Sequence, residues 1–200
     1  MSSVAIIGAG GHTRTLIHLL ELNGIHISAV FDEIVKSENE TILSYPVKPL
    51  TKVTNELKVV ISKGDVQDKL YFAKKYKNNI LLTNLIHPKA IIETSLIGNS
   101  NQISAGTYLA PTCEVGDQNV IYSGSVIEHE SCIGNFNTIT VNVSICGRVK
   151  IGDNCYIGAG AVILPNITIA DNVTIGAGSV VTKNIPESGT YIGIPAKKVI

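Results

Sequence analysis

An aliphatic residue occupies every sixth position of this chain between residues 97 and 181. A helix repeats every 3.6 residues and a strand every two, so neither element has this period. A six-residue repeat is typical of a parallel β-helix, in which each hexad forms one short side of a coil. The fifteen positions are Ile97, Ile103, Leu109, Val115, Ile121, Ile127, Ile133, Ile139, Ile145, Ile151, Ile157, Ile163, Ile169, Ile175 and Val181.

A longer period of eighteen residues indicates that three hexads make one three-sided coil. We expect corners where Gly, Asn or Asp recur, since these residues turn the chain most easily. The first such column reads Gly98, Gly116, Gly134, Gly152 and Ala170, each followed by Asn or Asp, and the second reads Gly106, Gly124, Asn142, Gly160 and Gly178. The third column differs, because it reads Pro111, His129, Gly147, Pro165 and Lys183.

Small side chains recur two residues before the aliphatic positions and suit the narrow interior of such a coil. We expect Asn101, Asn119 and Asn137 to stack one above another as an amide ladder. The repeat is predicted to begin one partial coil earlier, at Leu85 and Ile91.

Composition excludes several classes of protein. The formal net charge is zero, so nothing indicates a nucleic-acid or anionic membrane partner. No apolar run reaches the roughly 18 residues of a membrane span. The N-terminus lacks a basic region and its apolar run breaks at Gly8, so we expect no signal peptide and a cytoplasmic protein. The four cysteines form no CxxC pair and are interpreted as small buried hydrophobic residues rather than as metal ligands or disulfides.

The first 84 residues predict a separate α/β unit. A short apolar strand at 4–7 precedes glycines, a helix is expected over 13–22, and a second strand at 27–31 ends in Asp32 and Glu33. A third strand is expected at 59–61 and a second helix at 69–77. This βαβ opening predicts a Rossmann-like half-domain over residues 1–84, followed by an all-β parallel β-helix over residues 85–200.

The glycines at 8, 10 and 11 have three interpretations. Glycines after a strand let backbone N–H groups approach a phosphate at the start of a helix. A dinucleotide site is disfavoured because Thr13 stands where a third glycine is expected, and because the unit is only half of a doubly wound fold. A mononucleotide or sugar-nucleotide site is favoured over that reading and over a purely structural turn.

His129 is the residue that departs most from the repeat. It lies at an outward corner between Glu128 and Glu130, and Glu130 stands eighteen residues before Arg148, with which we expect it to pair. A carboxylate beside an imidazole orients the ring and favours its protonated form, which suits a general base. The alternative is a solvated surface triplet. A zinc site is not expected, because no second histidine lies at ligand spacing.

The whole chain resembles one family of acetyl-CoA-dependent sugar acetyltransferases, which join a small Rossmann-like domain to a left-handed β-helix of hexapeptide repeats. The family includes nucleotide-linked 4-amino-sugar N-acetyltransferases and sialic acid O-acetyltransferases. The left hand of the coil is implied by the resemblance alone. The motifs are residues 8–12 (GAGGH), 31–33 (FDE), 127–130 (IEHE), 157–161 (IGAGA), 175–181 (IGAGSVV) and 193–197 (GIPAK).

The resemblance implies roles for individual residues. His129 would be the catalytic base and Glu130 would raise its basicity. A homotrimer with active sites between neighbouring subunits is implied, with no metal. The residues that would bind the nucleotide part of the substrate are Gly10, Gly11, His12, Asp32, Glu33 and Ser62. The backbones of Ala159 and Ala177 would contact CoA.

Further roles follow from the predicted coil and from the reaction. A backbone N–H near Gly147 is expected to stabilise the tetrahedral oxyanion. His129 and Lys183 lie three coils apart, about 14 Å at the spacing of stacked strands. The acetyl group of CoA would therefore lie at His129 and its phosphates near Lys183, Lys197 and Lys198.

Two departures from the family concern the acceptor. Thr138 stands where amino-sugar relatives often carry a histidine near the acetyl group, so the resemblance implies that Thr138 contacts acetyl-CoA. Tyr122 stands where they often carry Asn. The first hypothesis is N-acetylation of a nucleotide-linked amino-deoxy sugar, such as a UDP- or dTDP-4-amino-4,6-dideoxyhexose. The second is sialic acid O-acetylation, because some relatives with that activity also lack this histidine. A non-catalytic β-helix scaffold is the third, and the charged corner and the glycine loop argue against it.

Overall fold

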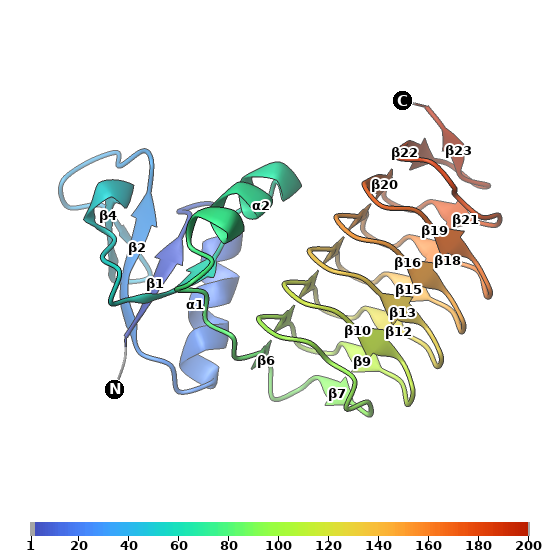
Figure 1. The fold of residues 1–200 in the computed structure, drawn as a ribbon, viewed down its shortest axis with the longest axis horizontal. Helices are drawn as coiled ribbons and strands as arrows, with labels where there is room; N and C mark the ends of the chain where they lie inside the picture. Colours follow the sequence, from blue (N-terminus) through green and yellow to red (C-terminus); the bar gives the residue numbers. More distant parts are fainter. Residues whose placement is uncertain (1–2, 200) are drawn as a thin grey trace. The chain divides into compact units, whose positions relative to one another are not determined.

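The computed structural model describes residues 3–199 and divides into two compact units, which meet at Leu85 and Ile86. Figure 1 shows a small α/β unit and a column of stacked coils, each of which is described here by itself. No helix within residues 3–199 is long and apolar enough to cross a membrane.

The N-terminal unit contains one five-stranded sheet in the order β3-β4-β2-β1-β5, in which only β3 is antiparallel to its neighbour. Its elements are β1 (Val4–Ile7), α1 (His12–Leu22), β2 (Ile27–Asp32), β3 (Thr41–Ile42), β4 (Tyr45–Pro49), the 3₁₀ helix η1 (Leu50–Lys52), β5 (Lys58–Ile61) and α2 (Val66–Lys75). The predicted strands and helices are all present, with bounds displaced by three residues or fewer. The hairpin β3-β4 was not predicted, because β3 has only two residues and β4 contains Pro46 and Pro49, so neither strand shows a clear alternating pattern.

Helix α1 forms because its apolar residues recur on one face. Leu16, Ile17 and Leu20 are fully buried and pack with Ile6 and Val30 of the sheet. The helix ends at Leu22. Two residues later Gly24 has a φ of +67°, which a right-handed helix does not allow, and its N–H donates to the carbonyl of Glu21. This packing holds the N-terminus of α1 at the carboxyl end of β1.

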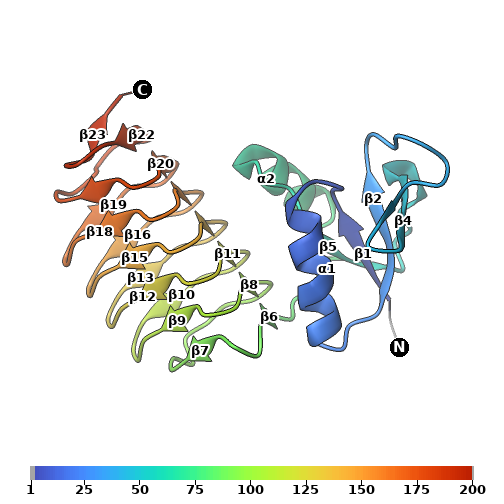
Figure 2. The ribbon, with the colours of Figure 1, turned by 180° about the vertical axis from the view of Figure 1, so that it is seen from behind.

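The second unit is a parallel β-helix with three sheets, each built from strands of mostly two residues (Figure 2). The eight-stranded sheet contains β6 (Leu85–Ile86), β8 (Gln102–Ile103), β11 (Val120–Ile121), β14 (Thr138–Ile139), β17 (Tyr156–Ile157), β20 (Val173–Ile175), β22 (Gly189–Ile192) and β23 (Lys197–Lys198). The six-stranded sheet contains β7 (Ile91–Ile92), β9 (Tyr108–Leu109), β12 (Val126–Ile127), β15 (Ser144–Ile145), β18 (Val162–Ile163) and β21 (Val180–Val181). The four-stranded sheet contains β10 (Glu114–Val115), β13 (Cys132–Ile133), β16 (Lys150–Ile151) and β19 (Thr168–Ile169).

The predicted hexads are confirmed. Each aliphatic residue pairs with the one eighteen positions later, as Ile121 does with Ile139. All of them from Ile103 to Val181 are at most 3% exposed, and only Ile97 is half-buried. At about 1.5–3 kcal/mol for each buried aliphatic side chain, these residues supply the main driving force of the column.

The first partial coil is offset by one residue from its predicted position. Strand β7 pairs Ile92 with Leu109, and Ile92 packs on the core, whereas Ile91 is 58% exposed. The step from β7 to β9 is therefore seventeen residues rather than eighteen. A one-residue slip exchanges the buried and exposed faces of a strand.

The corners also differ from the prediction in one respect. The second column turns as expected, with Asn142 at φ +56° among glycines of positive φ. In the first column the left-handed residue comes two positions after the glycine, as at Gln118 with φ +59°. A Cβ atom at Gly116 would lie 2.7 Å from the carbonyl oxygen of Gly134, so this glycine permits close stacking of coils rather than a turn.

The asparagine stack is present, but its bonds run to the backbone. The side-chain oxygen of Asn119 accepts the N–H of Asn137 at 2.8 Å, and its amide donates to the carbonyl of Gly134 at 2.9 Å. Asn101 bonds to the coil above it in the same way. The buried amides therefore join consecutive coils and satisfy main-chain groups inside the column.

Candidate active site

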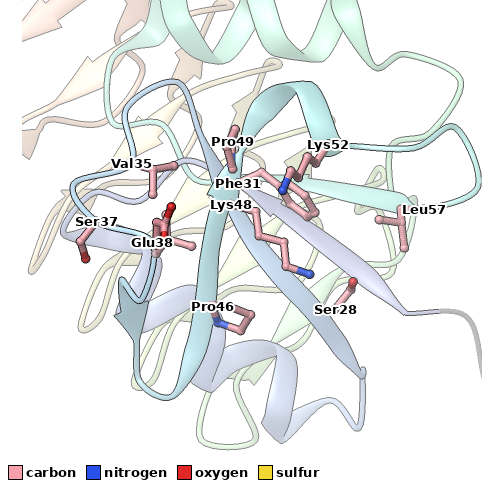
Figure 3. Close-up of a pocket in the computed structure, with 11 residues that line it drawn as sticks. Ser28, Phe31, Val35, Ser37, Glu38, Pro46, Lys48, Pro49, Lys52 and Leu57 are labelled. Carbon is pink, nitrogen blue, oxygen red and sulfur yellow. The ribbon is translucent and has the colours of Figure 1, made fainter.

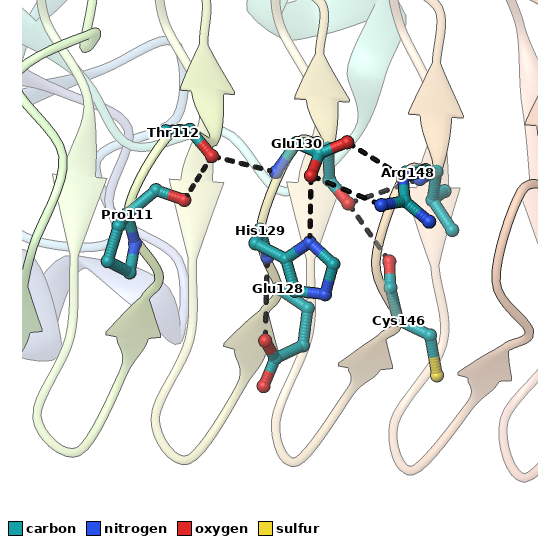
Figure 4. A network of polar contacts seen from close by, with 9 residues as sticks. Pro111, Thr112, Glu128, His129, Glu130, Cys146 and Arg148 are labelled. Carbon is teal, nitrogen blue, oxygen red and sulfur yellow. Dashed lines mark hydrogen bonds and ion pairs between the residues drawn. The ribbon is translucent and has the colours of Figure 1, made fainter.

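The third corner of the coil carries a row of side chains along one edge of the column. Thr112, Glu130, Arg148 and Asn166 each adopt a φ near +60° and repeat every eighteen residues. The N–H of Glu130 donates to Oγ1 of Thr112 at 3.3 Å, and the N–H of Arg148 donates to the carbonyl of His129 at 3.0 Å. Figure 4 shows how this row presents His129 beside Glu130.

His129, Glu130 and Arg148 form one polar chain on this edge. Nδ1 of His129 lies 3.5 Å from Oε1 of Glu130. The other carboxylate oxygen, Oε2, accepts the Nε–H of Arg148 at 2.7 Å, which confirms the expected pair. The hydrogen bond from Arg148 lowers the pKa of Glu130 below its ordinary value, with smaller contributions from the charge of Arg148 and from His129. Glu130 is therefore a carboxylate at neutral pH and fixes one side of the imidazole.

Gly147 lies directly against the other side of the ring. A Cβ atom at this position would lie 2.8 Å from both Cε1 and Nε2 of His129, closer than real Cβ contacts allow. Among residues 3–199, the N–H of Gly147 has no hydrogen-bond acceptor and Nε2 of His129 has no partner. The edge thus presents one basic nitrogen next to one open backbone donor.

The residues expected to contact CoA do not all share this edge. Lys183 is exposed and lies at the same corner of the coil as His129 and Gly147. Ala159 and Ala177 lie at the corner between the eight-stranded and six-stranded sheets, and Thr138 is a buried residue of β14 in the eight-stranded sheet. His129 instead lies between β12 and β13, at the corner of the six-stranded and four-stranded sheets. Within one β-helix, the residues expected to contact CoA therefore lie at two different corners and in one sheet rather than along a single edge.

Lys198 is already engaged by a carboxylate. Its Nζ atom donates to Oε2 of Glu187 at 3.1 Å, so its charge is partly neutralised by this exposed pair. Lys198 also belongs to β23 in the eight-stranded sheet rather than to the edge that carries His129. Lys197 lies in the same strand, so Lys183 is the best placed of the three predicted cations.

The glycine loop of the N-terminal unit lies between β1 and α1. Gly10 and Gly11 are exposed, and a Cβ atom at either would contact nothing within 4 Å. Gly11 is the N-cap of α1 and supplies no side-chain acceptor to the first-turn N–H groups. The exposed loop and the adjacent His12 thus form the helix start to which phosphates commonly bind.

Ser62 is placed behind this loop rather than in it. Its side chain is buried, and its Oγ lies 3.0 Å from Oγ1 of Thr13, which also donates to the carbonyl of Gly8 at 2.8 Å. Gly8 has a φ of +115°, and a Cβ atom there would lie 2.6 Å from the carbonyl oxygen of Ser62. Ser62 and Thr13 therefore hold the loop closed against β5, which explains a threonine at the third-glycine position.

Asp32, at the carboxyl end of β2, also holds the loop. Its Oδ2 accepts the N–H of Ala9 at 2.5 Å and its Oδ1 accepts the N–H of Glu33 at 2.6 Å. Partial burial opposes ionisation of Asp32, but the bond from Ala9 and the charge of Lys63 together leave its pKa below the ordinary value. Of the two predicted acidic residues, Glu33 is the exposed one.

Lys63 was not identified from the sequence. It follows Ser62 at the carboxyl end of β5, and its Nζ lies 3.4 Å from Oδ1 of Asp32 and 3.6 Å from Oε2 of Glu33. The carboxyl ends of parallel strands meet at one edge of a sheet, so its position directly after β5 was the available signal.

Neither described cavity coincides with the glycine loop or with His129. The larger, about 910 Å³, lies over β2 and β4 and is lined by apolar side chains together with two serines, Glu38, Lys48 and Lys52 (Figure 3). The other, about 570 Å³, is a groove over the four-stranded sheet of the column. The corner at His129 is an open surface, with about half of the imidazole side chain exposed. Within residues 3–199 no three His, Cys, Asp or Glu residues are arranged to hold a metal ion.

Two protein families match parts of the sequence. Residues 3–76 match the PglD N-terminal domain, and residues 133–164 and 148–183 match the bacterial transferase hexapeptide repeat. No curated protein matches the sequence at a significant level.

Several solved structures share the whole fold. PerB from Caulobacter crescentus, solved with CoA and GDP-perosamine, is 26% identical with a TM-score of 0.86, over 100% of this chain and 98% of PerB. The acetyltransferase domain of PglB from Neisseria gonorrhoeae is 23% identical with a TM-score of 0.88, over 100% of both chains. WeeI from Acinetobacter baumannii is 21% identical with a TM-score of 0.89, over 100% of both chains.

Proposed function

We propose that this chain, an acyltransferase of the group that joins a PglD-type N-terminal domain to a β-helix of hexapeptide repeats, acetylates the amino group of a nucleotide-linked amino-deoxy sugar. The observation that carries the proposal is the corner at His129, where Nδ1 faces Glu130 and Nε2 is open beside Gly147. Acetyl-CoA is the donor, as the CoA bound to PerB supports.

The reaction is an attack of the sugar amine on the thioester carbonyl carbon. Nε2 of His129 accepts the proton that the amine loses as the carbon–nitrogen bond forms. The N–H of Gly147 donates to the oxyanion of the tetrahedral intermediate. The carbon–sulfur bond then breaks, and the imidazolium returns its proton to the CoA thiolate, so that the products are an N-acetyl sugar and CoA.

The nucleotide part of the acceptor is assigned to the N-terminal unit. Its diphosphate would lie at the start of α1, against Gly10, Gly11 and His12, where N–H groups and the helix dipole favour anions. Glu33 would face the nucleoside. Asp32 and Ser62 would act by holding the loop in shape, because their side chains are already bonded to it.

We also assign the complete site to a homotrimer. Lys183 lies on the edge of His129, whereas Ala159, Ala177 and Thr138 belong to other parts of the column. A CoA molecule that contacts both sets would lie between two columns, with Lys183 near its phosphates. Sedimentation of the purified protein as a monomer with full activity would remove this assignment.

A direct assay separates the candidate activities. Release of free thiol from acetyl-CoA is followed with UDP-, dTDP- and GDP-linked 4-amino sugars and, separately, with sialic acid. Thiol release with a 4-amino sugar nucleotide supports the proposal. Release with sialic acid alone supports O-acetylation, which is the second hypothesis because Thr138 replaces the histidine that amino-sugar relatives often carry. A scaffold would release no thiol and would not be stabilised by CoA against thermal unfolding.

The role of His129 is tested in the same assay. Replacing His129 by Ala should lower turnover by at least about 100-fold, in line with general-base catalysis. His18→Ala, on helix α1, is the matched control and should retain turnover. Near-normal turnover of His129→Ala would overturn the mechanism.

A further inference from the structure

Lys63 places a positive charge directly against the glycine loop. Its Cδ atom lies 3.3 Å from where a Cβ atom of Gly8 would be, so the stem of the side chain passes over the start of the loop. Its side chain is only 14% exposed, and Nζ lies 5.2 Å from the ring centroid of Phe72 in α2. The ammonium is thus held between the carboxyl ends of β2 and β5.

The ion pair with Asp32 does not account for this placement. Both oxygens of Asp32 already accept short bonds from backbone N–H groups, at 2.5 and 2.6 Å. Lys63 approaches Asp32 and Glu33 only at 3.4 and 3.6 Å. The Lys63 ammonium has three N–H donors. Because its contacts with the two carboxylates are long, it can donate to an acceptor that approaches more closely.

The local charge also requires a cation if a diphosphate is to bind here. Asp32 and Glu33 place two negative charges at the edge of the sheet where the diphosphate would bind. The diphosphate itself carries at least two more negative charges. Without Lys63 this edge would repel a diphosphate, whereas with it the ammonium lies between the two acidic residues and the loop.

We propose that Lys63 is a substrate-binding residue that contacts the diphosphate of the sugar nucleotide and gives the site its preference for nucleoside diphosphates over nucleosides. The inference rests on the proposed function, because it takes the nucleotide to lie at the glycine loop. Lys63 donates to a phosphate oxygen, while Asp32 keeps its two backbone bonds and continues to hold the loop.

The test is the binding of UDP, dTDP and GDP, and of uridine, thymidine and guanosine, by isothermal titration calorimetry with the full chain. A charge-assisted bond of this kind predicts that Lys63→Gln weakens binding of the best diphosphate by about 10- to 100-fold. Nucleoside binding should change by less than about 3-fold, and Lys63→Arg should largely restore diphosphate binding. Binding by Lys63→Gln should also depend less on salt than binding by the native protein.

The test includes one control and one substitute variant. Lys58→Gln removes an exposed lysine from the other end of β5 and should leave both affinities unchanged. Lys63→Met keeps the apolar stem over Gly8 and near Phe72, so it replaces Lys63→Gln if that variant does not fold.

The possible failures are distinguishable. Unchanged diphosphate affinity in Lys63→Gln or Lys63→Met overturns the role of Lys63 alone. An equal loss for nucleosides and diphosphates also overturns it, because it indicates that Lys63 only maintains the shape of the site. If the native protein binds none of the three diphosphates, the proposed nucleotide-sugar function itself fails.

Discussion

The imidazole of His129 lies so close to Gly147 that a methyl group at position 147 would sit 2.8 Å from both Cε1 and Nε2 of the ring. The two residues occupy the same corner of consecutive coils, eighteen positions apart. The stacking of the β-helix thus brings an imidazole against a glycine backbone whose N–H is open.

Gly147→Ala should displace the imidazole, since the added methyl group overlaps two ring atoms. We expect the protein to fold and kcat/KM for thiol release to fall by about 10- to 100-fold, a part of what general-base catalysis contributes. Pro165→Ala, one coil further along the same column, is the control and should retain activity. A folded Gly147→Ala protein with native kcat/KM would show that the contact has no catalytic consequence.

Glu130→Gln should lower turnover by about 10-fold or more, because the neutral amide no longer supports the proton that His129 accepts. KM for both substrates should change little if Glu130 acts only through His129. Glu114→Gln, an exposed carboxylate on β10 one coil below Cys132, is the matched control. Steady-state kinetics of the two variants measure the effect, and equal turnover in both would contradict the assignment.

Asp32 should make the N-terminal unit sensitive to acid. Its pKa in the folded state is lowered, so its carboxylate stabilises the fold above its ordinary pKa of 3.8, and this stabilisation is lost as pH falls through the folded-state value. The difference in Tm between the native protein and Asp32→Asn should therefore be constant near neutral pH and shrink below about pH 4. A difference that is the same at pH 7 and pH 3 would exclude this origin.

Asn119→Ala should destabilise the column from within. It removes the acceptor of the N–H of Asn137 and the donor to the carbonyl of Gly134, both inside the coil. Leaving two buried groups unpaired costs roughly 2–4 kcal/mol. Urea unfolding measures this loss, with Ser144→Ala on the exposed side of β15 as the control. A free energy of unfolding within about 0.5 kcal/mol of the native value would refute the ladder's contribution.

Features that repeat at a constant step along the chain could be predicted from the sequence. The hexads identified the buried positions from Ile103 to Val181, because one aliphatic residue per side of a narrow coil is a strictly periodic requirement. The same pattern failed at Ile91, where the coil begins and no earlier turn enforces the register. The pairing of Glu130 with Arg148 could be predicted, since stacked positions differ by one constant step.

Lys63 shows the opposite case. Its position directly after an apolar strand was the one local signal, and it comes to lie beside Asp32 only when β2 and β5 flank β1 in one sheet. The contact of Ser62 likewise depends on the tertiary structure, since its Oγ lies 3.0 Å from Oγ1 of Thr13, 49 residues away in the sequence.

The amino-acid sequence by itself determined the two-part architecture, the coil of three hexads and the corner that carries His129, because each depends on a repeat or a motif of neighbouring residues. Only the tertiary structure decided that Gly147 packs on the imidazole and that Lys63 lies against the glycine loop. Those relations depend on distances between segments far apart in the chain, and such distances are set by how sheets and coils pack.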